Sequence, residues 1–107
     1  SPLIALNLLW YPAFENLFSI IRRIIAGKNI QTADRYHLHT LIFRKMIKKN
    51  NANISNSATG IFLNIFMSIG IFISMHFFYA SKILVLILFT NIIIYLIAYF
   101  YFYRKNK

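Results

Sequence analysis

Two long apolar runs dominate the second half of the chain. Residues 61–80 and 83–103 contain no Asp, Glu, Lys or Arg, and only Ser81 and Lys82 separate them. Twenty helical residues are about 30 Å long, which matches the hydrocarbon core of a bilayer, and a single segment satisfies its own backbone there only as a helix. The pattern therefore predicts two transmembrane helices, over 58–80 and 83–103, that form an antiparallel hairpin.

A shorter apolar segment opens the chain. Residues 3–10 are apolar apart from Asn7, and Tyr11 and Pro12 follow directly. This segment is too short to cross a bilayer, and proline interrupts helices. We therefore expect residues 1–12 to be the end of a further span that stops near Pro12.

An amphipathic helix is predicted next, beginning near Phe14. Glycine is a frequent helix stop, so we expect this helix to end at Gly27. The spacing of the apolar residues is helical. They are Phe14, Leu17, Phe18, Ile21, Ile24 and Ile25, whereas the other face carries Glu15, Ser19, Arg22 and Ala26.

A second amphipathic helix is predicted after a polar connection, with Thr32 or Asp34 as its N-cap. Its apolar positions are Leu38, Leu41, Ile42, Met46 and Ile47. Residues 50–57 are polar, neutral and without periodicity, which indicates a linker. Ser57 or Thr59 would then cap the first helix of the hairpin.

Composition narrows the class of protein. The chain is 59% hydrophobic, 18% aromatic and only 13% charged, which excludes both an ordinary soluble domain and a disordered basic tail. It has no cysteine, which excludes a disulfide framework and a thiolate site. It begins with Ser rather than Met, so we expect a piece of a longer protein. The predicted fold is all-α and integral to the membrane. Its expected parts are the end of a span (1–12), a loop (13–57), transmembrane helices (58–80 and 83–103) and a tail (104–107).

The basic residues give the expected orientation. Of twelve Lys and Arg, eight lie between Arg22 and Lys49 and three lie after Tyr103, while Lys82 stands alone between the two spans. Cytoplasmic loops are enriched in Lys and Arg, so the loop and the C-terminus are expected in the cytoplasm. The partner is then a lipid bilayer and not a nucleic acid. An aromatic belt is expected near the cytoplasmic end of the last helix, formed by Tyr95, Tyr99, Tyr101 and Tyr103.

One group of residues combines an acid with potential bases: Asp34-x-x-His37-x-His39. Two residues along a helix rotate a side chain by about 200°, so both histidines face one site only where the backbone is not regular helix. A loop that enters a helix meets this condition. A helix N-terminus with arginines nearby, here Arg23 and Arg35, also favours phosphate.

Plainer interpretations remain open for these residues. Asp34 alone could be an N-cap, and the histidines could be ordinary interfacial side chains. Zinc would need a third ligand, for which Asp34 is the one nearby candidate. His76 lies towards the outer end of its span and fits a neutral interfacial role. Other small or polar residues of the spans are expected to pack helices together: Asn64, Ser68, Gly70, Ser74 and Asn91.

An ordered set of residues over about forty positions favours the chemical interpretation. The set is Pro12, Glu15, Arg22, Arg23, Gly27, Asp34, His37 and His39. In this order and spacing it resembles the last cytoplasmic loop of the polyprenyl-phosphate N-acetylhexosamine-1-phosphate transferases, the MraY/WecA-like family. In that family a further histidine often stands where this chain has Thr40.

The resemblance implies an enzyme of the bacterial inner membrane that works in cell-envelope polysaccharide biosynthesis. Such an enzyme moves a sugar-1-phosphate from a UDP-N-acetylhexosamine to polyprenyl (undecaprenyl) phosphate, releases UMP and requires Mg²⁺. The catalytic and metal-binding aspartates of the family belong to earlier loops, which the remainder of the same polypeptide would supply. This chain would therefore be inactive alone and contribute substrate-binding residues: Arg23, Asp34, Arg35, His37 and His39.

The competing interpretation is a small basic membrane hairpin without enzymatic activity, which binds anionic lipids or a membrane partner. Eight cationic residues beside a membrane would attract anionic headgroups at about 1 kcal/mol each. This interpretation predicts no dependence on the histidines.

The topology can be tested by cysteine labelling. We expect a cysteine at position 82 to react with a membrane-impermeant thiol reagent in intact cells, and one at position 106 to be protected, because basic residues favour the cytoplasmic side. The opposite pattern would mean that the orientation is reversed.

Overall fold

The computed structural model describes residues 2–29 and 36–105. This part of the chain consists of helices and their connections, without a strand. The helices are α1 (Pro2–Ile25), α2 (Leu38–Ile47), α3 (Ala52–His76) and α4 (Ser81–Lys105). Of these, α1, α3 and α4 are long and apolar enough to cross a membrane. The prediction of an all-α membrane fold is confirmed.

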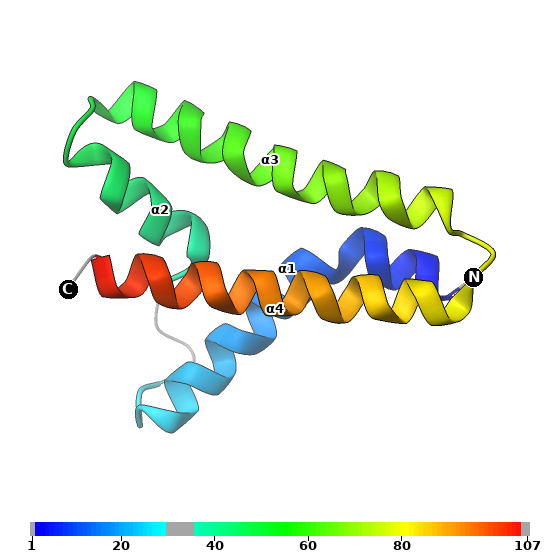
Figure 1. The fold of residues 1–107 in the computed structure, drawn as a ribbon. Helices are drawn as coiled ribbons and strands as arrows, with labels where there is room; N and C mark the ends of the chain where they lie inside the picture. The colour runs from blue at the N-terminus through cyan, green and yellow to red at the C-terminus, as the bar shows by residue number, and fades with distance from the viewer. Residues whose placement is uncertain (1, 30–35, 106–107) are drawn as a thin grey trace.

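The helices α3 and α4 form a hairpin, and α1 and α2 pack at its opposite ends. Figure 1 shows α3 and α4 running in opposite directions, with the first half of α1 along α4 and the chain's N-terminus near the turn between α3 and α4. Asn7 fixes this end, because its Nδ2 donates to the backbone oxygen of Leu84 at 3.2 Å. At the other end, α2 lies between the beginning of α3 and the end of α4.

The expected stop near Pro12 is wrong, because α1 is one helix of 24 residues with Pro12 inside it. Proline has no backbone N–H to donate, and its ring crowds the preceding turn. A helix that contains proline therefore kinks there, while the residues on either side remain helical. Figure 1 shows α1 changing direction part-way along its length. The proposed boundary between 1–12 and 13–57 therefore falls within one element.

The expected linker over 50–57 is also largely helical. Helix α3 begins at Ala52 because Asn51 caps it, with the Asn51 side chain accepting from the Ile54 N–H at 2.8 Å. Ser57 and Thr59, the caps expected from the sequence, lie within the helix. Thr59 is buried there and donates to the backbone oxygen of Ser55 at 2.8 Å.

Gly27 ends the helix as predicted. Its φ is +71°, and the Lys28 N–H bonds to the Arg23 oxygen at 2.9 Å while the Gly27 N–H bonds to the Ile24 oxygen at 3.1 Å. This pair of bonds is the Schellman arrangement, which requires a left-handed residue at this position. Glycine takes that conformation without a steric penalty.

The packing places polar groups inside and apolar groups outside. Most of the buried side chains on the three long helices are polar: Asn7, Glu15, Ser19, Ser55, Thr59, Ser74 and Asn91. On α1 the face with Glu15 and Ser19 turns inward, whereas Leu17, Ile21 and Ile24 are exposed. Hydrocarbon can surround the apolar side chains but cannot hydrogen-bond the polar ones, so this arrangement suits a bilayer.

An aromatic cluster joins α1 to α4. The ring centroids of Phe14 and Tyr95 are 5.0 Å apart and those of Phe18 and Tyr99 are 4.8 Å apart, both in edge-to-face geometry. Tyr95 and Tyr99 are buried in this cluster, so their assignment to an interfacial belt is wrong. Such ring pairs contribute about 0.5–1.5 kcal/mol each beyond the area they bury.

The contact between α3 and α4 depends on a small residue. Gly70 and Ser74 are buried as expected, and Asn91 packs against Gly70, where an added Cβ would lie 3.1 Å from the Asn91 Nδ2. Asn64 and Ser68 are exposed, so their predicted role in packing within this bundle is wrong.

Gly70 offers a test of the packing. We expect Gly70→Leu to lower the free energy of unfolding by about 1–3 kcal/mol, because the larger side chain must displace Asn91. Unfolding in mixed micelles can be followed by the fluorescence of Trp10, the single tryptophan. Gly60→Leu on the same helix is the matched control, because a Cβ there meets nothing within 4 Å. Equal effects of the two variants would contradict the packing role.

Candidate functional site

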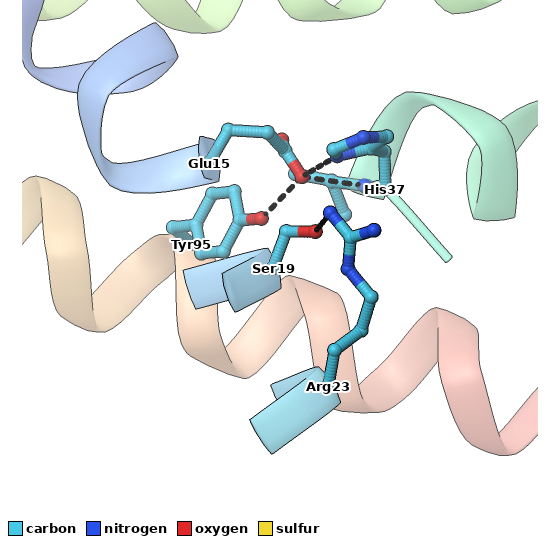
Figure 2. Close-up of polar contacts among 6 residues, drawn as sticks. Glu15, Ser19, Arg23, His37 and Tyr95 are labelled. Atoms are coloured by element: carbon cyan, nitrogen blue, oxygen red, sulfur yellow. Dashed lines mark hydrogen bonds and ion pairs between the residues drawn. The ribbon is translucent and has the colours of Figure 1, made fainter. Parts of the chain in front are cut away.

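The carboxyl group of Glu15 connects three helices. Its Oε1 lies 2.7 Å from the Tyr95 hydroxyl, 3.0 Å from the Leu38 N–H and 3.2 Å from the Nδ1 of His37. Figure 2 shows these contacts converging on one oxygen. Glu15 belongs to α1, Tyr95 to α4, and His37 and Leu38 to the start of α2. We call these four residues the Glu15 cluster.

Glu15 serves as the N-cap acceptor for α2 from a different helix. The N-cap residue His37 has extended backbone with ψ 152°, and its side chain makes no cap hydrogen bond. The Leu38 N–H is one of the donors that a helix start leaves without an intrahelical partner. Glu15 accepts from this donor, and an anionic group is also favoured at the positive end of the helix dipole.

The two histidines lie side by side at the beginning of α2. His37 precedes the helix while His39 is within it, so the backbone between them is not regular helix and the condition derived from the sequence is met. Their rings stack with centroids 5.5 Å apart and planes 10° apart. His37 is half-buried against Glu15, and His39 is exposed. We call these two residues the histidine pair.

The two arginines of α1 have different surroundings. Arg23 folds back along the helix, and its Nη2 donates to the Ser19 Oγ at 3.1 Å, below the Glu15 carboxyl group in Figure 2. The guanidinium of Arg22 lies over the rings of Phe18 and Tyr99, at 5.4 and 5.2 Å from their centroids. Arg23 therefore points back towards the turn that carries Glu15, while Arg22 packs against α4.

A pocket of about 400 Å³ opens between α2 and α3 beside the histidine pair. His39 and Thr40 line it from α2, and Asn56 and Thr59 line it from α3, with Phe43 and Gly60 adding to its wall. Two of the predicted site residues, Asp34 and Arg35, lie outside the described residues. The expectation that Thr32 or Asp34 caps α2 is wrong, because the N-cap of this helix is His37.

The described side chains do not form a metal site. Within residues 2–29 and 36–105, no group of three His, Cys, Asp or Glu could hold a metal ion. Mg²⁺ prefers carboxylate oxygens, and the one carboxyl group in this part of the chain, that of Glu15, is buried and already accepts from α2 and α4. These residues do not fit a Mg²⁺ site, and we assign none of them to metal.

The sequence pattern did not identify Glu15 and Tyr95 as partners. The pattern assigns Glu15 to the polar face of an amphipathic helix and Tyr95 to an aromatic belt at the membrane surface. The signal that could have identified Glu15 is its isolation, because an ionisable residue within an apolar helix usually faces the bundle interior and finds a partner there.

Comparisons with known proteins add no relative. No protein-family model, no curated protein and no solved structure matches the chain.

Removing the Glu15 carboxyl group tests its role at α2. We expect Glu15→Ala to increase hydrogen exchange of the α2 amides, because the Leu38 N–H and the Tyr95 hydroxyl both lose their acceptor. Buried donors left without a partner cost about 1–3 kcal/mol. Asn16→Ala, at the exposed neighbouring position, is the control and should leave exchange unchanged. Unaltered α2 exchange in Glu15→Ala would contradict the capping role.

Proposed function

We propose that this chain is part of a membrane transferase that moves a sugar-1-phosphate from a UDP-N-acetylhexosamine to polyprenyl phosphate. The chain supplies part of the nucleotide-sugar site and not the reacting groups. Such a transfer belongs to the biosynthesis of cell-envelope polysaccharides at the bacterial inner membrane, with the α2 end of the bundle on the cytoplasmic side.

The observation that carries the proposal is the histidine pair held at the start of α2 by Glu15. Transfer of a phosphoryl group depends mainly on positioning and on neutralising charge. Two stacked imidazoles on a capped helix start form a fixed polar surface, and the exposed ring of His39 can contact a ligand. Preorganised donors of this kind need no rearrangement during the reaction.

The surroundings of the pair suit an anionic sugar nucleotide. Arg23 adds a cation on the neighbouring helix, which favours an anionic ligand. The adjoining pocket combines the amide of Asn56, the hydroxyls of Thr40 and Thr59 and the ring of Phe43, which are groups that can bind a sugar or a base. We assign Arg23, His37 and His39 to substrate, together with Asp34 and Arg35 from the sequence motif.

Mg²⁺ enters the proposal only as a cofactor of the complete enzyme. It would neutralise charge on the diphosphate, and its carboxylate ligands would come from other parts of the polypeptide. The competing interpretation, a basic hairpin that binds anionic lipid, makes the lysines important and the histidines irrelevant.

Alanine variants in the complete polypeptide separate the two interpretations. We expect His39→Ala to lower sugar-phosphate transfer by about 100-fold or more, the scale of losing one transition-state contact. Lys49→Ala, an exposed position beyond the end of α2, should change transfer far less. Thr40→His should be tolerated, because related transferases often carry histidine there. The measurement is the transfer of labelled sugar phosphate at equal expression, and an unimpaired His39→Ala would refute the site assignment.

A further inference from the structure

A group of lysines gathers at the shared end of α2 and α4, away from the Glu15 cluster. The Lys45 Nζ lies 2.9 Å from the Tyr101 hydroxyl and 4.5 Å from the centroid of its ring, and the Lys105 Nζ lies 5.9 Å from the same centroid. The Lys48 Nζ lies 3.3 Å from the backbone oxygen of Lys105. We call Lys45, Lys48, Lys105 and Tyr101 the lysine cluster.

The described residues offer these ammonium groups no negative partner. The whole chain has two acidic residues against twelve Lys and Arg. Glu15 is buried among α1, α2 and α4, and Asp34 lies outside the described part. The partners that the structure gives the three lysines are a hydroxyl, a backbone carbonyl and aromatic rings. Like charges that share one end of a molecule repel one another, and a bound anion lowers this repulsion.

The position of the lysine cluster identifies the anion. The cluster lies where the apolar run of α4 ends, and Tyr101 is exposed there, as is common for aromatic side chains at a membrane surface. The Lys45 Nζ lies 5.2 Å from the centroid of Phe102, so the lysine stem follows apolar surface while its charge remains at the end of the helix. In a bilayer that α4 spans, this end of the helix lies at the level of the lipid headgroups, whose phosphates are anions.

We propose that the lysine cluster binds the phosphate of an anionic phospholipid headgroup at the basic end of the α3–α4 hairpin. Lys45 and Lys105 both place their ammonium groups near the Tyr101 ring, Lys48 adds a third ammonium group from the end of α2, and Tyr101 fixes Lys45 by its hydroxyl. A bound headgroup would stabilise α2 against α4. This inference uses none of the residues assigned to the nucleotide sugar, so the two proposals can fail separately.

Lipid selectivity tests the proposal. The protein is reconstituted in vesicles of phosphatidylcholine with one-fifth phosphatidylglycerol, and spin-labelled lipids report which headgroup is enriched around it. We expect the protein to enrich phosphatidylglycerol, and Lys45→Gln/Lys105→Gln to lower that enrichment by about fivefold for each lysine removed, since a lysine near an anionic surface contributes about 1 kcal/mol. Tyr101→Phe should give a smaller loss, because it removes only the hydroxyl that fixes Lys45.

A second double variant controls for net charge. Lys28→Gln/Lys82→Gln removes two charges from other parts of the molecule and should keep the enrichment. If both double variants lose enrichment equally, the attraction is a property of total charge and the proposed site is wrong. Retained enrichment in Lys45→Gln/Lys105→Gln, with helix content unchanged by circular dichroism, would also overturn it.

Inorganic phosphate distinguishes a lipid site from a site for a soluble anion. Replacing chloride by phosphate at equal ionic strength should leave the enrichment of phosphatidylglycerol unchanged if the headgroup is held at the bilayer surface. Complete displacement by phosphate would show that the lysine cluster binds small anions, and the lipid assignment would be wrong.

Discussion

The hydrogen bonds accepted by Glu15 hold the short helix α2 in place between the long helices. Glu15 is only 6% exposed, so its carboxyl group needs hydrogen-bond donors, and α2 and α4 provide them. The same contacts fix where α2 begins and how His37 faces α1. Because His37 and His39 stack on each other, the position of the exposed His39 ring also depends on Glu15.

The polar faces of the helices point towards the inside of the bundle for the same reason, because a buried polar group needs a hydrogen-bond partner. In a bilayer the surrounding hydrocarbon accepts apolar side chains on any surface, so there is little to gain from burying them. Polar side chains lose hydrogen bonds unless the bundle supplies partners. Asn7, Glu15 and Ser19 therefore lie on the inner face of α1, and the first two reach α4 directly through Leu84 and Tyr95.

Two groups of basic residues differ in their chemistry. Arg23 and the histidine pair lie near Glu15, where Arg23 and His37 are half-buried and His37 stacks on the exposed His39. The lysine cluster lies at the end of the molecule around one exposed tyrosine. In the two proposals, the first group binds the nucleotide sugar and the second binds lipid headgroups.

The sequence alone determined the elements whose causes are local. Apolar length predicted the α3–α4 hairpin, helical spacing predicted α2 and the second half of α1, and Gly27 predicted the end of α1, because each depends on residues within a turn or a span. Two local signals were nevertheless misleading. Helix α1 continues through Pro12 although proline removes one of its hydrogen bonds, and α3 begins earlier than expected because Asn51 caps it.

Only the tertiary structure decided the partners of Glu15 and the arrangement of the candidate site. His37, Leu38 and Tyr95 are 22, 23 and 80 residues away from Glu15 along the chain, and no local pattern pairs them. The spacing of His37 and His39 shows only that they could share a site if the backbone between them is not regular helix. Packing of α2 against α1 and α4 met that condition, because the helix starts where Glu15 accepts from its first N–H.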